Sequence, residues 1–210
     1  MRKAEARAVF YVMDAYCGWC WGLSPRMIQF EAANRDRIAF TAISGGLFTG
    51  QRAAPLSAYP HIPEANARIE QTTGVRFGSA YQALLKDGSM VMDSEGAAIA
   101  LAALRDVAPE RALNWAHHVQ EAFYVHGQSL SDISTIRDIA NRNGLDEDEV
   151  MQRVEDGTAR AAAHADFVKA ARLGVTSYPT LLFIDGSRVH QLPATGSTLE
   201  DLTMRLDALI

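Results

Sequence analysis

Cys17 and Cys20 are the only two cysteines among the 210 residues of this chain, and they lie three positions apart. Residues 9–13, which precede them, are apolar, β-branched or aromatic, as is typical of a buried strand. The residues after them follow a helical pattern. The pair therefore lies at a strand-to-helix junction, with Cys17 at the start of the helix and Cys20 one turn inside it. A C-x-x-C pair beside a β-α-β pattern is a specific indication of redox chemistry.

The position of each cysteine predicts its role. The first turn of a helix has backbone N–H groups without intrahelical partners and carries the positive end of the macrodipole, so a thiolate is favoured there over a thiol. We therefore expect Cys17 to be the attacking sulfur. Cys20, which is set back in the helix, is expected to resolve a mixed disulfide by attacking it and releasing the product.

Composition and the N-terminus bear on partners and compartment. The formal net charge of −5 argues against a nucleic-acid partner, and no apolar run is long enough to cross a bilayer. Residues 1–7 are charged and lead directly into the strand, without the apolar segment of an export signal. We therefore predict a cytoplasmic protein, whose cysteine pair is functional because reducing compartments do not maintain structural disulfides. Nothing in the pattern indicates an oligomeric state.

The residues after the cysteines complete a βαβ unit. Residues 21–37 have apolar side chains at helical spacing, with Pro25 near the start, where proline is tolerated. Residues 38–43 read as a second strand, which ends in the loop Ser44-Gly45-Gly46-Leu47. The glycines of this loop permit a sharp turn or a close approach of another segment to the backbone. The two strands of such a unit are expected to be parallel.

From residue 55 to residue 173 the pattern is helical throughout. Seven helices are expected, beginning near Pro63, Gly78, Ser94, Pro109, Ser134, Asp146 and Thr158, and several are expected to end at a glycine. The strand pattern returns at residues 180–184, followed by the turn pair Asp185-Gly186, a short strand at 188–191 and a last helix at 198–209. We therefore predict one domain from residues 8–54 and 174–210, with a helical domain of residues 55–173 inserted into it and packed onto it.

At this point the chain resembles a known family. An α/β order of βαβ followed by ββα, with C-x-x-C at the first helix and a proline just before the third strand, is similar to the thioredoxin fold. The large helical insertion between the two halves resembles the DsbA-like members. Residues 14–22 and 174–180 are similar to the FrnE-like branch of that family, which is described as disulfide isomerases and oxidoreductases. The resemblance implies a thiol-disulfide oxidoreductase or disulfide isomerase that works through the Cys-Gly-Trp-Cys pair.

The resemblance also implies residues of a substrate site. In such folds the proline that matches Pro179 is cis and lies beside the sulfurs, so Tyr178 and Pro179 are expected to face Cys17 and to shape the substrate cleft. The residue between the cysteines is usually exposed, so Trp19 is expected to contact substrate, whereas Trp21 is expected to be core. The substrates would be protein or small-molecule thiols and disulfides.

The chain departs from the family pattern at one position. Related proteins have an acidic residue in the strand beneath the first cysteine, six positions before it, where this chain has Tyr11. The nearest acidic residue is Asp14, for which a capping or turn role is expected.

No metal or organic cofactor is expected, and glutathione is a candidate co-substrate. A metal site would need ligands beyond the two cysteines, and none of the six histidines lies in a ligand-like pattern with them. His61 is the histidine to compare with the site, because it follows the glycine loop. Two other functions stay open: a glutathione-dependent transferase or isomerase of the related kappa-like branch, and a thioredoxin-fold binding or chaperone module without catalysis.

Overall fold

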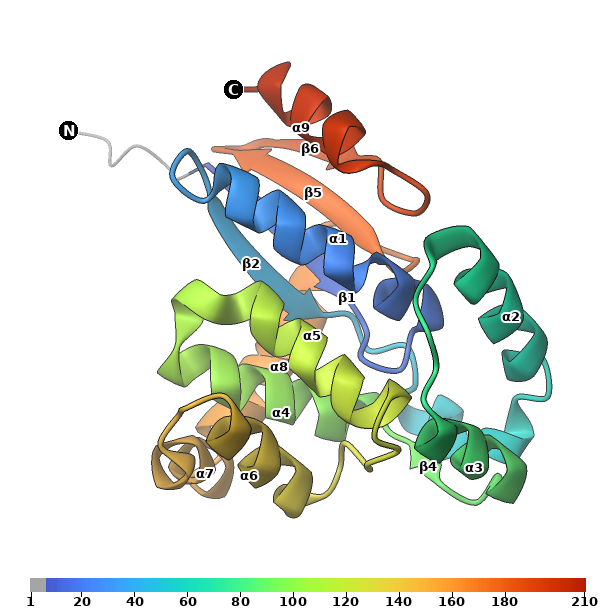
Figure 1. Ribbon diagram of the computed structural model, residues 1–210. Coiled ribbons are helices and arrows are strands. Elements are labelled where there is room, and N and C mark those ends of the chain that lie inside the picture. Colours follow the sequence, from blue (N-terminus) through green and yellow to red (C-terminus); the bar gives the residue numbers. More distant parts are fainter. Residues whose placement is uncertain (1–6) are drawn as a thin grey trace.

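A four-stranded sheet is formed by two strands from the first part of the chain and two from the last part (Figure 1). The computed structural model describes residues 7–210, so most of the charged N-terminal segment on which the cytoplasmic prediction rests lies outside the described residues. The strands are β1 (Ala8–Met13), β2 (Ala39–Ser44), β5 (Thr180–Asp185) and β6 (Arg188–Leu192), in the order β2-β1-β5-β6. β1 is parallel to β2 and antiparallel to β5, and β5 is antiparallel to β6. The predicted βαβ and ββα halves are therefore confirmed as parts of one sheet.

Both faces of the sheet are covered. Helices α1 (Gly18–Asn34) and α9 (Leu199–Asp207) complete the two halves, and Figure 1 shows α1 lying across the sheet with α9 beside it. Along β1, Val9, Tyr11 and Met13 belong to the large core that includes α1. Val12 belongs to a smaller cluster with Ala170 of the helix before β5. This alternation follows from the two-residue period of a strand.

The first helix begins at the predicted cysteine and ends earlier than the pattern predicts. The helix starts directly after Cys17 and ends at Asn34, three residues before the predicted end at residue 37. The N–H groups of Arg37 and Ile38 both donate to the Asn34 carbonyl, and they close a turn that leads into β2. A periodic pattern alone does not distinguish such a turn from one more turn of helix.

The segment between β2 and β5 is almost entirely helical, as predicted. Its helices are α2 (Ile62–Thr73), α3 (Ser79–Asp87), α4 (Ser94–Val107), α5 (Ala112–Tyr124), α6 (Ile133–Arg142), α7 (Glu147–Glu155) and α8 (Thr158–Arg172), with short 3₁₀ turns at Gly50–Arg52, Leu56–Ala58 and Pro109–Arg111. The left-handed glycines Gly74 and Gly88 end α2 and α3. One apolar core runs through this segment and the sheet, so the expected packing is confirmed, whereas the division at residues 55 and 173 stays a prediction.

One expectation for this segment is wrong. Residues 54–55 and 91–92 pair as a short antiparallel ribbon, β3 (Ala54–Pro55) with β4 (Val91–Met92), where only helix was expected. A strand of two residues is too short to show a periodic pattern in the sequence. The ribbon ties the start of the helical segment to the start of α4.

The glycine loop after β2 lies against the loop before β5. The Gly45 N–H donates to the Met13 carbonyl at 2.8 Å, which extends the pairing of β1 and β2 by one residue. The ring of Tyr178 covers Gly45, and its hydroxyl donates to the Gly45 carbonyl. A Cβ at Gly45 would lie 1.9 Å from the Tyr178 ring, so the close approach expected of this loop is confirmed.

Replacing Gly45 by alanine is therefore predicted to destabilise the protein by roughly 1–3 kcal/mol, the usual cost of overpacking. Urea denaturation would measure the change in the free energy of unfolding. The contact between the two loops can be isolated with Tyr178→Ala, because the alanine at residue 45 should cost little once the ring is gone. An equal cost of Gly45→Ala in both backgrounds would contradict this explanation.

Candidate active site

Cys17 is the N-cap residue of α1. Its backbone is extended, its N–H donates to the Asp14 carbonyl at 3.1 Å, and its carbonyl accepts the Trp21 N–H at 3.1 Å. No side chain caps the helix, and its first turn contains no acidic residue. The sulfur of Cys17 therefore lies at a helix terminus whose N–H groups have no side-chain cap and whose positive dipole end faces no acidic residue of the first turn. The predicted position at the strand-to-helix junction is confirmed.

Cys20 lies one turn further along and is more deeply buried. Its exposed fraction is 0%, against 6% for Cys17, and both cysteines are free thiols. Burial raises the pKa of the Cys20 thiol well above its usual range, and a hydrogen bond from this thiol to Cys17 raises it further. Cys20 is thus held as a protonated thiol one turn from Cys17.

The loop before β5 brings Tyr178 to the first cysteine. The Tyr178-Pro179 peptide bond is cis, and the Cys17 thiol donates to the Tyr178 carbonyl at 3.5 Å. These two residues are 161 positions apart in the chain. The expected cis geometry and the expected proximity to Cys17 are both confirmed, while the role of Tyr178 and Pro179 in binding substrate stays a prediction.

Asp14 is a turn residue, as expected, and it has a second structural role. One carboxylate oxygen accepts the Tyr16 N–H at 3.0 Å, and the other accepts the Leu47 N–H at 2.7 Å. Burial raises the pKa of this carboxyl, and these backbone hydrogen bonds partly oppose the rise. Asp14 thereby fixes the loop that leads to Cys17 against the glycine loop after β2.

Tyr11 occupies the space beneath the cysteines where related proteins have an acidic residue. Its ring is 1% exposed, and its hydroxyl donates to the Cys20 carbonyl at 3.0 Å. Burial, followed by the proximity of the two cysteines, raises the pKa of Tyr11 well above its usual range. A neutral phenol therefore lies under the cysteine pair. Its hydroxyl binds the backbone of α1 at Cys20, at the position where the family resemblance implies an acidic side chain.

Trp19 and Trp21 lie in different environments, as expected. Trp19 is half-buried and lines a surface cavity, whereas Trp21 is 6% exposed. The indole N–H of Trp21 donates to the Arg76 carbonyl at 3.2 Å, and its ring stacks on His117 and on Tyr124. Trp21 is therefore core, and the role of Trp19 toward substrate stays a prediction.

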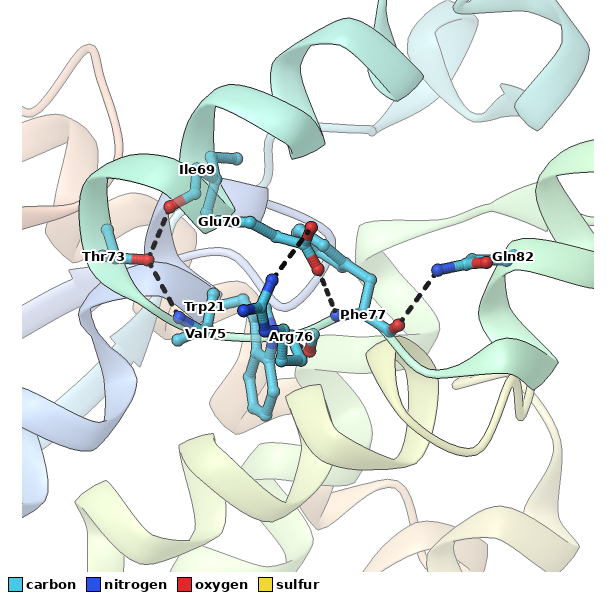
Figure 2. Close-up of polar contacts among 8 residues, drawn as sticks. All are labelled: Trp21, Ile69, Glu70, Thr73, Val75, Arg76, Phe77 and Gln82. Atoms are coloured by element: carbon cyan, nitrogen blue, oxygen red, sulfur yellow. Dashed lines mark hydrogen bonds and ion pairs between the residues drawn. The ribbon is translucent and has the colours of Figure 1, made fainter.

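The Trp21 hydrogen bond helps to fix the linker between α2 and α3, residues 74–78, against α1. Figure 2 shows this linker beside Trp21, with Glu70 of α2 directed toward it. The Glu70 carboxylate accepts the Phe77 N–H at 3.1 Å and pairs with Arg76 at 3.8 Å. The C-terminal end of α2 is thus held next to the first turns of α1.

Several residues of the helical segment contact the site and were not predicted from sequence. A Cβ at Gly18 would lie 2.8 Å from Ile69, 3.5 Å from Asn66 and 3.9 Å from the Tyr124 hydroxyl, so these three side chains border the first turn of α1. Asn66 is buried and donates to the Tyr81 hydroxyl at 3.0 Å. These residues sit on ordinary amphipathic helices, and no local motif distinguishes them from core.

The histidines lie apart from this chemistry. His61 is exposed and contacts Tyr59 edge-on. His117 is half-buried and already has partners, since its Nδ1 lies 2.9 Å from the Ser24 hydroxyl and its ring stacks on Trp21. Across residues 7–210, no group of three or more histidine, cysteine, aspartate or glutamate side chains is arranged to hold a metal ion.

Comparison with known proteins agrees with this geometry. A family model described as "DSBA-like thioredoxin domain" matches residues 8–201. No curated protein matches the chain. Within the part of the chain that the structure describes, no helix is both long and apolar enough to span a membrane.

Solved structures share the fold over nearly the whole chain. A "putative protein disulfide isomerase" from Nitrosomonas europaea is 21% identical with a TM-score of 0.82, and the match covers 97% of each chain. The cytosolic disulfide reductase DsbM from Pseudomonas aeruginosa is 23% identical with a TM-score of 0.80, covering 96% of this chain and 98% of DsbM. DsbM has also been solved with GSH, and that structure is 24% identical with a TM-score of 0.78, covering 96% and 98%. At these identities the likeness shows the fold.

The difference between the two thiols predicts their reactivity. At pH 8, iodoacetamide should modify Cys17 in the Cys20→Ser variant at least about tenfold faster than Cys20 in the Cys17→Ser variant, because only the thiolate reacts and each unit of pKa is a factor of ten in thiolate. Mass spectrometry of the intact variants would measure both rates. Equal rates in folded protein would contradict the assignment of Cys20 as the shielded thiol, and both variants should react equally fast in urea.

Proposed function

The chain belongs to the DsbA-like thioredoxin family, and from this membership we propose that it is a thiol-disulfide oxidoreductase in which Cys17 attacks and Cys20 resolves. The observation that carries the proposal is the asymmetric pair itself. Cys17 lies at the uncapped start of α1 against the Tyr178 carbonyl, and Cys20 lies one turn further along as a buried thiol whose pKa is raised. A nucleophile beside a shielded resolving thiol is the arrangement that disulfide exchange requires.

The proposed reduction has two exchange steps. The Cys17 thiolate attacks one sulfur of the substrate disulfide, so a bond forms between Cys17 and that sulfur, the substrate S–S bond breaks, and the first product leaves as a thiolate. Cys20 then gives up its proton to solvent or to a leaving thiolate and attacks the Cys17 sulfur, which releases the second product. The substrate gains two electrons, and the protein is left with a Cys17–Cys20 disulfide.

A second thiol must return the protein to its reduced state. We propose that low-molecular-weight thiols of the glutathione class do so, by two exchange steps in the opposite sense that leave one oxidised thiol dimer. DsbM, which shares the fold, is described as a cytosolic disulfide reductase and has been solved with GSH, and this supports the proposal. The reductive direction and a cytoplasmic location belong together, because the cytosolic thiol pool is reducing.

Substrate contacts are proposed for Tyr178, Pro179 and Trp19. Proline offers no N–H, and the Tyr178 carbonyl accepts the Cys17 thiol, so an extended substrate segment can lie along this loop when the thiol is consumed. Trp19 is the half-buried aromatic residue between the cysteines, and its ring offers apolar contact to whatever is joined to the Cys17 sulfur.

Turnover of bis(2-hydroxyethyl) disulfide by purified variants tests the exchange. Cys17→Ser should abolish turnover, because the attacking sulfur is gone. Cys20→Ser should accumulate a covalent adduct on Cys17 that intact-mass measurement detects as one attached thiol. If Cys17→Ser keeps full turnover, or if no intramolecular disulfide forms in any glutathione buffer, the proposal fails and a binding or chaperone function is favoured.

The equilibrium reduction potential of the Cys17–Cys20 pair tests the direction. Titration in glutathione buffers should give a two-electron transition near about −270 mV, the range of a reductase. A value near about −120 mV, which is typical of a strong oxidant, would contradict the reductive direction while leaving the exchange mechanism intact.

A further inference from the structure

A cavity of about 450 Å³ opens along α1, the helix that begins directly after Cys17. Its floor is the outward face of α1 from Trp19 to Gln29, and its walls are the C-terminal turn of α2 and the loop 195–198 before α9. Figure 1 shows one end of α2 and this loop near the first half of α1. We call this cavity the Arg26 groove. Trp19, which lies between the two cysteines in the sequence, lines the groove, so the groove begins at a residue next to the pair, although neither cysteine lines it.

The shape of the groove follows from helix spacing and from one glycine. Trp19, Gly22 and Arg26 are three and four positions apart, so they share one face of α1. A Cβ at Gly22 would lie 2.9 Å from Thr73, so the absence of a side chain there allows the end of α2 to lie against α1. The Trp21 hydrogen bond to the α2–α3 linker helps to hold that wall in place.

Charge selects the kind of molecule that this groove accepts. Arg26 is the single charged residue among those that line it, and no carboxylate lines it. Arg26 forms no ion pair with any residue from 7 to 210, whereas the chain as a whole carries a net charge of −5. A half-buried, unpaired guanidinium in such a setting favours a carboxylate partner, which it can bind through two parallel N–H groups.

The nearby start of α9 does not offer an alternative anion site. Thr198 and Asp201 form a capping box there, in which each side chain accepts the backbone N–H of the other at 3.0 Å. The Thr198 N–H is thus paired with the Asp201 carboxylate and the Asp201 N–H with the Thr198 hydroxyl, and the acidic Glu200 and Asp201 of the first turn disfavour an anion there. Arg26 is therefore the group in the groove that is free to meet an anion.

Distance bounds the size of the ligand. Arg26 lies nine positions after Cys17, an axial rise of about 13 Å and about two and a half turns of α1, so the two residues lie on opposite sides of the helix axis; helical side chains tilt toward the N-terminus, which shortens the axial part of this span for the guanidinium. A single amino acid is too short to reach from one to the other, so the ligand is of peptide size.

We propose that the Arg26 groove binds the part of the substrate that lies away from the reacting sulfur, and that it selects peptide-sized thiols and disulfides with a free carboxylate that pairs with Arg26. The proposal rests on the exchange mechanism above and names the class of its small co-substrate. While the Cys17 sulfur forms its bond to the bound sulfur and the substrate S–S bond breaks, Arg26 holds the carboxylate end. Arg26 is thus a specificity-determining residue.

Steady-state kinetics with two disulfides tests this assignment, with dithiothreitol as the reductant of the Cys17–Cys20 disulfide and the uncatalysed rate subtracted. In Arg26→Gln, kcat/KM for oxidised glutathione should fall about fivefold, mainly through KM, which is the scale of a partly exposed charge pair. Turnover of the neutral bis(2-hydroxyethyl) disulfide should not change. Arg172→Gln is the matched control. This substitution makes the same change in net charge, and Arg172 is exposed and does not line the groove. In the wild type, KM for oxidised glutathione should rise with salt, and this rise should be weaker in Arg26→Gln.

Binding of S-methylglutathione, which cannot undergo exchange, gives a readout that does not depend on turnover. Calorimetry should show about fivefold weaker binding to Arg26→Gln than to the wild type or Arg172→Gln. An equal loss for both disulfides, or no change in either KM or binding, would overturn the role of Arg26 and leave the exchange mechanism standing. If the wild type turned over neither disulfide, the exchange mechanism would fail, and the binding comparison would still decide whether the groove takes a carboxylate.

Discussion

The pairing of β1 with β5 is the interaction on which the site depends. These strands are antiparallel, with Val12 opposite Thr180, so the end of β1 and the beginning of β5 meet at the same edge of the sheet. The loop that carries Cys17 leaves that edge, and the loop that carries Tyr178 and Pro179 arrives there. Residues 161 positions apart are thereby brought to a sulfur-to-oxygen distance of 3.5 Å. The position of the two groups thus depends on the backbone hydrogen bonds between β1 and β5, in which neither cysteine takes part.

Hydrogen bonds from the loops around the cysteines then limit how far these groups can move. Asp14 accepts N–H groups from its own turn and from the glycine loop, and the Tyr178 hydroxyl donates to Gly45 in that same loop. A buried carboxylate is costly unless such donors surround it, which explains why backbone N–H groups converge on Asp14. Because the three loops are tied to one another, a change in any of them is transmitted to the position of Cys17.

The helical segment contributes a wall as well as a core. The end of α2 is drawn against α1 where Gly22 has no side chain, and Trp21 and Glu70 secure the linker that follows it. This arrangement leaves one face of α1 open between α2 and the loop before α9, with Arg26 along it. The end of α2 therefore forms one wall of a groove along α1, and the charged residue that lines this groove is Arg26.

The sequence by itself determined the order of the main elements, the helix boundaries at glycine and the position of Cys17 and Cys20 at a strand-to-helix junction. Each of these depends on local chemistry that is visible within a few residues, whereas the cis proline loop is expected from the family resemblance. Only the tertiary structure decided that the Tyr11 hydroxyl donates to the Cys20 carbonyl, that Asn66, Ile69 and Tyr124 border the first turn of α1, and that residues 54–55 pair with residues 91–92 as β3 and β4. Those features depend on which faces of distant helices meet, and an amphipathic pattern shows that a face is buried without showing what it is buried against.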